Sequence, residues 1–239
     1  MKAALAHASW ELRLTLRNGE QLLLTLIIPL VLLIAMCVTS FVPAAEGLSR
    51  VASAFPVVCT VSVIATCFTS LAIGTGFERR SGALTFLATT PLGRQGLVIG
   101  KVIATILLAA LSIALVTVTA ITLGWRPSPA AIWALPILII AGIAFASWAL
   151  FIASAFRAEA VLAIANALFL LLILLGGVII NSTSMPLGGL VALLPSAALA
   201  NCLRETLGSG TAPGWPAIFT LFAWAIVGFA LARSRFRWQ

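Results

Sequence analysis

The chain has 239 residues, of which 62% are hydrophobic and only 8% carry charge, and it contains no aspartate. Soluble domains carry about 25% charged residues, so this composition excludes a soluble globular protein and predicts an all-α integral membrane protein. The net charge of +8 does not indicate nucleic-acid binding, because the cations are scattered near the ends of apolar runs. The four cysteines predict no disulfide framework, since three of them lie within those runs.

Residues 1–19 are too polar to cross a membrane and predict a helix lying in the interface. Apolar side chains recur along one face of this helix: Leu5, Ala8, Leu12 and Leu16. The single histidine, His7, is interpreted as a surface residue, because no cysteine or carboxylate cluster accompanies it.

Six apolar runs follow, each near the ~20 residues that cross a ~30 Å hydrocarbon core. The six predicted spans are Gln21–Phe41, Phe55–Thr75, Val98–Leu123, Ala131–Phe156, Ala160–Ile180 and Trp215–Ala232. A cleaved signal peptide is the alternative for the first run, because Val42-Pro43-Ala44 resembles a cleavage site. That run is longer than the usual apolar region of a signal peptide, which favours a span.

The cations divide unequally between the two sides of this arrangement. One side carries Lys2, Arg13, Arg17, Arg79, Arg80, Arg94, Lys101, Arg157, Arg233, Arg235 and Arg237, and the other carries Arg50, Arg126 and Arg204. Cytoplasmic loops are enriched in Lys and Arg, so both termini are predicted to be cytoplasmic in a plasma membrane.

Residues 76–97 form the predicted cytoplasmic loop between the second and third spans. Placing even one Arg or Lys at mid-bilayer costs about 2.5–3.5 kcal/mol, so the cations clustered here must lie in water. Within the loop, Gly82–Thr90 predicts a short helix that Pro91 ends. Leu84 and Leu87 give this helix an apolar side, which suits a partner protein better than catalysis.

Residues 181–214, between the fifth and sixth spans, are moderately apolar and contain Pro195. Irregular backbone exposed to lipid is not stable at membrane depth. The sequence therefore predicts two short re-entrant helices, one on each side of Pro195, that dip in from the outside.

No motif in the chain predicts catalysis or a metal site. Gly96-Leu-Val-Ile-Gly100-Lys101 resembles a phosphate-binding loop only superficially, because it has three residues between the glycines instead of four. Gly100 is interpreted as a close helix contact and Lys101 as a side chain reaching the interface. Glu159 is expected to pair with its neighbour Arg157.

Polar side chains inside the predicted spans have two possible roles. They are Ser62, Thr66 and Thr69 in the second span, Thr105, Ser112 and Thr119 in the third, and Asn166 near Phe169 in the fifth. Hydroxyl and amide groups commonly join packed helices, and the alternative is contact with a transported substrate. Because no span carries a central carboxylate, a proton- or sodium-driven carrier is disfavoured.

The loop and the outer segment together resemble a known family. The residues are Glu78-Arg79-Arg80-x-Gly82, Leu87-x-x-Thr90-Pro91, Gly100-Lys101 and Leu194-Pro195-Ser196-Ala197. This pattern, with six spans after an N-terminal interfacial helix, resembles permease subunits of ATP-binding-cassette transporters of the type-2 exporter class, which includes daunorubicin-resistance-type permeases. Relatives often have an acidic residue where this chain has Thr85.

The resemblance implies an assembly of two permeases with two cytoplasmic ATPase subunits that bind ATP and magnesium. The helix around Gly82–Thr90 would be the coupling helix, and Glu78, Arg79, Arg80, Gly82, Leu84, Leu87, Thr90 and Pro91 would contact the ATPase. Spans two and five would line the substrate cavity, with Thr66, Thr69, Asn166 and Phe169 as candidate contacts. Alternating access would then export an amphipathic or hydrophobic substrate, drug or lipid-like, with no cofactor in this chain.

Two other functions remain open at this stage. The same fold could export haem or a glycan, although the absence of tyrosine disfavours a glycan channel. A membrane assembly factor that transports nothing is the third possibility, and association with an ATPase would separate it from the other two.

Overall fold

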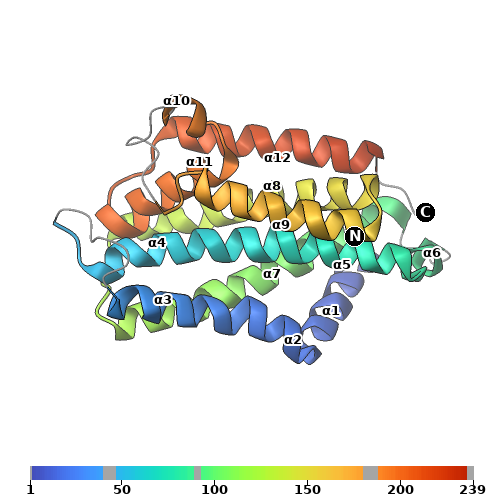
Figure 1. The fold of residues 1–239 in the computed structure, drawn as a ribbon, viewed down its shortest axis with the longest axis horizontal. Coiled ribbons are helices and arrows are strands. Elements are labelled where there is room, and N and C mark those ends of the chain that lie inside the picture. Colours follow the sequence, from blue (N-terminus) through green and yellow to red (C-terminus); the bar gives the residue numbers. More distant parts are fainter. Residues whose placement is uncertain (1, 40–46, 89–92, 180–187, 236–239) are drawn as a thin grey trace.

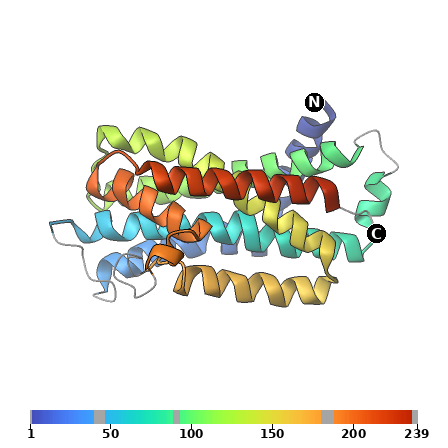
Figure 2. The same ribbon diagram turned by 90° about the horizontal axis from the view of Figure 1, so that it is seen from above.

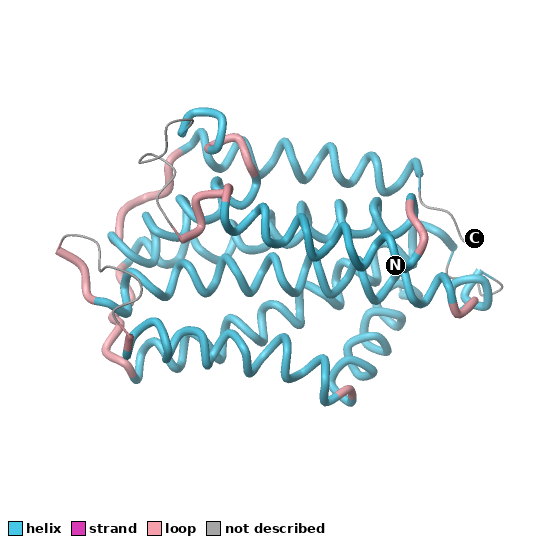
Figure 3. The backbone as a smooth tube through the Cα atoms, in the orientation of Figure 1, coloured by secondary structure: helices cyan, strands magenta, loops and turns pink. Residues whose placement is uncertain are grey.

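The computed structural model describes residues 2–39, 47–88, 93–179 and 188–235. Within these ranges all regular structure is helical and no strand is present (Figure 3). The long helices lie side by side with nearly parallel axes (Figure 1). This confirms the all-helical class predicted from composition.

Five helical stretches in the described residues are long and apolar enough to cross a membrane. They are Gly19–Val38, Arg50–Arg80, Gln95–Thr122, Pro129–Ala155 and Trp215–Ser234. A sixth apolar helix, α9 (Ala158–Leu174), has 17 residues, which at 1.5 Å per residue gives about 25 Å, less than the ~30 Å core. The count of six spans therefore stays a prediction.

The first half of the chain builds an N-terminal helix and three spans. These elements are α1 (Lys2–Arg17), α2 (Gly19–Leu22), a π-helical turn (Leu23–Ile27), α3 (Ile28–Val38), α4 (Arg50–Val63), a second π-helical segment (Ile64–Ser70), α5 (Leu71–Arg80), α6 (Ala83–Ala88) and α7 (Gly93–Thr122). The side chain of Asn18 accepts from the amide of Gln21 and caps α2, so the chain turns sharply between α1 and the first span (Figure 1).

The second half adds the remaining spans and a short outer segment. Its elements are a 3₁₀ turn (Pro129–Trp133), α8 (Ala134–Ala155), α9, α10 (Gly188–Val191), α11 (Pro195–Leu203), a π-helical segment (Arg204–Ser209) and α12 (Trp215–Arg235). Pro195 stands at the first position of α11, where its missing N–H costs no hydrogen bond. Short helices therefore lie on both sides of Pro195 as predicted, while residues 181–187 lie outside the described residues. Their depth in the bilayer stays a prediction.

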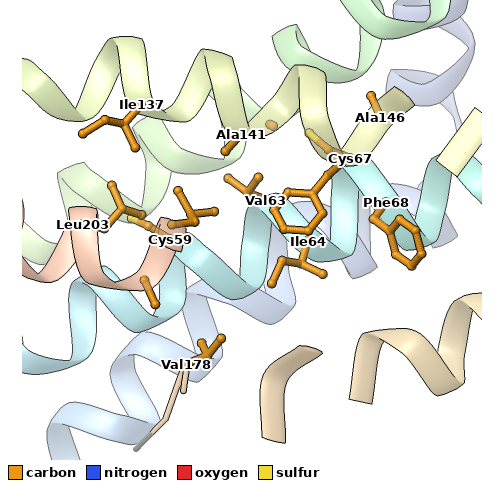
Figure 4. Close-up of a cluster of buried hydrophobic side chains, with 14 of the residues drawn as sticks. Cys59, Val63, Ile64, Cys67, Phe68, Ile137, Ala141, Ala146, Val178 and Leu203 are labelled. Carbon is orange, nitrogen blue, oxygen red and sulfur yellow. The ribbon is translucent and has the colours of Figure 1, made fainter. Parts of the chain in front are cut away.

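The second span, formed by α4, the π-helical segment Ile64–Ser70 and α5, is the centre of the molecule. In its apolar stretch of 18 residues, 78% of the residues are buried inside the protein, compared with 22% in the corresponding stretches of the first and last spans. In Figure 4, side chains of this span such as Val63 and Cys67 lie against Ile137 and Ala141 of α8, and Cys59 lies near Leu203 of α11. Any movement of the second span must therefore displace several neighbouring helices.

Serine hydroxyls join the first three spans. Ser112 Oγ donates to the carbonyl oxygen of Thr25 at 2.7 Å and lies 2.9 Å from Ser62 Oγ. Because the Ser112 proton is used for Thr25, Ser62 must be the donor in the second bond. The interpretation of Ser62 and Ser112 as contacts between helices is thus supported by the geometry.

Candidate functional site

The charged loop predicted over residues 76–97 is shorter in the structure. The helix that contains the second span continues through Glu78 and Arg79 to Arg80, and α7 begins at Gly93, so helix extends beyond the apolar runs that end at Thr75 and begin at Val98. Where the membrane boundaries lie along these helices stays a prediction. Gly82, with a φ of 79°, turns the chain, and α6 follows at once against α5. The short helix predicted after Gly82 is therefore present as a direct extension of the second span.

A cluster of charged side chains holds α1, α5 and α7 together near α6. The Lys101 ammonium on α7 lies 2.7 Å from Glu78 Oε2 on α5 and also pairs with Glu11 Oε1 on α1. His7 Nε2 lies 3.4 Å from the same Glu11 oxygen. Lys101 is only 1% exposed, so the expectation that it reaches the interface was wrong, as was that of a surface His7, which is 7% exposed. Two carboxylates replace the water that Lys101 loses.

Glycine at position 100 makes this cluster possible. A Cβ at Gly100 would lie 2.7 Å from His7 Cδ2 and 3.0 Å from the carbonyl oxygen of Ala4. The predicted close helix contact at Gly100 is therefore present, and it is made with α1. The buried side of α1 is its small and polar side, which carries Ala4, His7 and Ala8, while the predicted apolar face keeps Leu5 and Leu16 exposed.

The pKa of Glu11 reflects this environment. Burial alone raises the pKa of the Glu11 carboxyl, but the nearby His7 imidazole and the charge of Lys101 outweigh burial and hold this pKa below its ordinary value. Glu11 is therefore ionised at neutral pH and fixes one side of the Lys101 ammonium.

Two arginines tie α5 to the turn between α8 and α9. Arg79 donates to the carbonyl oxygen of Ser154 at 2.6 Å and to that of Phe156, at the end of α8. Carbonyls at a helix C-terminus lack partners within the helix and carry partial negative charge, so a cation is favourable there. Arg80 pairs with Glu159 in the first turn of α9, which corrects the expected pair with Arg157.

The apolar side of α6, which was predicted to face a partner protein, is partly buried within this chain. Leu84 is 1% exposed and Leu87 is half-buried against the core of this chain. Phe86 is 74% exposed, and Thr85 and Ala83 are exposed beside it. The exposed side of α6 is thus centred on Phe86, a residue that the sequence analysis did not single out. Thr90 and Pro91 lie outside the described residues.

A cavity of 610 Å³ lies between α1, α5, α6 and α7. Polar side chains along its wall come from the first three spans and from the N-terminal segment before them: Gln21, Thr66, Ser70, Thr75, Glu78, Lys101 and Thr105, together with Glu11, Thr15 and Asn18. Gln21 Nε2 donates to Ser70 Oγ at 3.1 Å across this space. The hydroxyls of Thr66 and Thr75 are buried and have no hydrogen-bond partner within the described part of the chain.

Of the four predicted substrate contacts, Thr66 lines this cavity and the other three do not. Thr66 lines the cavity, while the buried hydroxyl of Thr69 also lacks a partner among the described residues. Asn166 is exposed on α9 and donates to the carbonyl oxygen of Leu162, four residues earlier. Phe169 packs against the core. No described residue that lines the cavity belongs to α9.

The family of the chain follows from a comparison with known proteins. Residues 4–207 match the ABC-2 type transporter family, so the match covers all three helices around the charged cluster. The chain belongs to this family. No individual curated protein matches the chain. This ABC-2 protein is thus the transmembrane component of a transporter, and the matched part is a membrane transport domain and not a catalytic one.

The residues that the sequence analysis missed share one property. His7 and Glu11 lie one turn apart on α1 but are distant in sequence from Lys101, and the connection depends on how α1 crosses α7. The available signal was electrostatic, because an isolated charge near the start of an apolar helix needs a partner.

Proposed function

We propose that this ABC-2 protein is the permease subunit of an ATP-driven exporter and moves an amphipathic or hydrophobic substrate, drug or lipid-like, out of a bacterial cell. Two permeases would assemble with two ATPase subunits that bind ATP and magnesium on the cytoplasmic side of the plasma membrane. Both termini and α6 would lie on that side. The finer likeness to daunorubicin-resistance-type permeases belongs to this proposal.

The observation that carries the proposal is the direct continuity between α6 and the most buried span. α6 follows α5 after a two-residue turn at Ser81 and Gly82. Because this connection is short, a displacement of α6 would be transmitted directly to the second span. Lys101 and Arg79 connect α5 further to α1, α7 and α8. In a two-state transporter, such links would convert closure of the ATPases into a different packing of the spans.

The contact with the ATPase would centre on Phe86. Its large apolar side chain is the most exposed part of α6, and exposed aromatic residues are enriched among the dominant contacts of protein interfaces. Glu78, Arg79 and Arg80 would act indirectly, since their charges are bound within this chain. Leu84 and Leu87 would hold α6 in place, and Gly82 would set its direction.

A second permease would pack along α9. This helix lies at one edge of the molecule in Figure 2 and exposes Leu162, Leu170, Leu171 and Leu174 together with Asn166. An exposed amide on a lipid-facing helix is unfavourable unless another polar group reaches it. Asn166 would therefore meet a second copy or a substrate held between two copies.

The coupling proposal is tested with Phe86→Ala in the permease purified with its ATPase. We expect the variant to lose most of the stimulation of ATP hydrolysis and most of the retained ATPase. Phe219→Ala is the matched control, because Phe219 is 68% exposed and belongs to a different helix, near the start of α12. Equal behaviour of the two variants would refute Phe86 as the coupling contact. Transport by the chain without any ATPase would refute the proposal as a whole.

A further inference from the structure

Three threonine side chains of the second span depart from a common pattern of this protein. Among the described residues, seven threonine hydroxyls, including that of Thr60 in the same span, donate to the carbonyl four residues earlier in their own helix: Thr25, Thr39, Thr60, Thr117, Thr119, Thr206 and Thr220. Thr66, Thr69 and Thr75 have no hydrogen-bond partner within the described part of the chain. A buried hydroxyl without a hydrogen-bond partner is unfavourable. Three such hydroxyls in one span therefore require an explanation.

The backbone alone does not account for these three hydroxyls. Thr66 and Thr69 lie in the π-helical segment Ile64–Ser70, but Thr25 and Thr206 lie in other π-helical segments and still donate to the carbonyl four residues earlier. Segments of this kind occur frequently at functional sites. Thr66 and Thr75 share a different property, because both line the 610 Å³ cavity, and a molecule in that cavity would supply the missing partner.

The cavity has the size and the lining of a small-molecule site. Ligand sites commonly measure about 300–1,000 Å³ and combine apolar walls with a few polar groups. Here Leu71, Ala104 and Leu108 supply apolar wall, and the free hydroxyls belong to Thr66 and Thr75. Other lining residues are exposed and mark its mouth: Trp10 (52%), Leu14 (48%) and Phe86 (74%).

The charges beside the cavity restrict the ligand. Lys101 is the cation on the wall, and its ammonium is already bound by Glu11 and Glu78. An anionic head group would have to displace one of these carboxylates or approach both of them. A cationic head group would compete with Lys101 for the same oxygens. The hydroxyls of Thr66 and Thr75 favour instead an uncharged group that accepts hydrogen bonds.

We infer that this cavity binds an uncharged amphipathic molecule, whose hydroxyl, ester or carbonyl oxygen accepts from Thr66 and Thr75 while its chain lies along Leu71 and Leu108. The molecule enters past Trp10 and Phe86. The site is contained within one chain and lies apart from the exposed face of α9. Binding here requires neither a second permease nor an ATPase, so it can fail or hold independently of the proposed export.

The test uses the purified full chain in lipid nanodiscs and three photoactivatable probes with the same acyl chain: a monoacylglycerol, a fatty acid and an alkylamine. We expect the monoacylglycerol to label peptides around residues 66–75 and 101–108 at least tenfold more than either charged probe. Thr66→Val and Thr75→Val should each reduce that labelling about threefold to tenfold, the effect of one neutral hydrogen bond. Thr60→Val is the matched control, because Thr60 lies in the same span and donates within its helix.

Gly74→Leu provides a variant that does not depend on the hydroxyls. A Cβ at Gly74 meets nothing within 4 Å and Gly74 lines the cavity, so leucine fills the space while favouring the helix. We expect this variant to fold and to lose the labelling at least tenfold. Equal labelling by all three probes, or labelling that persists in Gly74→Leu, would overturn the inference.

Discussion

The two ends of the helix bundle are held together by different chemistry. At the α6 end, ion pairs join the helices: Lys101 binds Glu11 and Glu78, and Arg80 binds Glu159. At the α10 end, Trp125 Nε1 donates to the carbonyl oxygen of Leu207 at 2.8 Å, and its ring packs edge-on against Phe55. The half-buried Arg204 there donates to backbone carbonyls, including that of Gly177 at 2.6 Å.

This difference bears on which end is suited to move. Long charged side chains can exchange partners when helices shift, because their attraction depends weakly on geometry. A tryptophan N–H on one carbonyl requires a fixed distance and angle, and close apolar packing resists sliding. The α6 end, which is proposed to receive force, is therefore the adaptable end, and the α10 end is the fixed one. Substitutions at each end test this contrast.

The largest effect is expected from Lys101→Met. The variant leaves Glu11 and Glu78 close together without their cation, which for a buried pair costs about 3–5 kcal/mol. We expect a large decrease in the free energy of unfolding measured by urea titration in detergent, together with detachment of α1. Detachment is monitored by the fluorescence of Trp10. A Trp10→Phe variant, which lacks this signal, gives the background from the other tryptophans. Arg233→Met, at an exposed cation of α12, is the control and should change little.

A second variant distinguishes two causes of instability in Lys101→Met, the unpaired carboxylates and the lost packing of the lysine side chain. The triple variant Lys101→Met, Glu11→Gln and Glu78→Gln removes all three charges at once and should recover much of the stability. A triple variant as unstable as Lys101→Met would show that the ammonium acts through packing and that the contrast between the ends is wrong.

The sequence predicted the helices better than the contacts between them. Five of the six apolar runs coincide with helices long and apolar enough to cross a membrane, and Gly100 signalled a close approach. The apolar runs did not show how far the helices extend beyond them, as past Thr75, because the sequence does not state which charges meet. In the structure Lys101 neutralises Glu78, and Arg79 finds carbonyls of α8, so the second span continues to Arg80.

The candidate site depended on information that no single segment contains. The cavity requires α1 to cross α7, and the sequence does not state which helix covers Gly100. The π-helical segment Ile64–Ser70 has no pattern of residues that distinguishes it from an α-helix. The position of Thr66 in the second span was predictable, but its freedom from an intrahelical hydrogen bond was not.

The second largest effect is expected from Arg79→Gln. The guanidinium donates to two carbonyls at the end of α8, and hydrogen bonds from charged donors contribute about 1.5–3 kcal/mol. We expect a loss of that order in the free energy of unfolding, with faster hydrogen exchange of amides near Ser154. Protection of those amides unchanged from the wild type would argue against a structural role for Arg79.

At the α10 end, Trp125→Phe should cost somewhat less, roughly 1–2 kcal/mol, because one neutral hydrogen bond is lost and the carbonyl of Leu207 loses its buried donor. The loss should be the same at low and high salt, since no ionic group takes part. Trp133→Phe, at a half-exposed tryptophan of the neighbouring 3₁₀ turn, is the control. A salt-dependent loss in Trp125→Phe would contradict the assignment of this end to neutral contacts.

The smallest effect is expected from Arg80→Gln, and it sharpens the contrast within the α6 end itself. Arg80 and Glu159 are both more than half exposed, so water screens their attraction and the pair contributes about 0–1 kcal/mol. The loss in unfolding free energy should shrink further between 0.01 M and 1 M salt, where the screening length falls from roughly 30 Å to 3 Å. The buried cluster around Lys101 is 1% exposed at its ammonium and should keep its contribution over the same range. If Lys101→Met and Arg80→Gln lost their effects in parallel as salt increased, Lys101 would be accessible to solvent, and α1 would be only loosely held against α7.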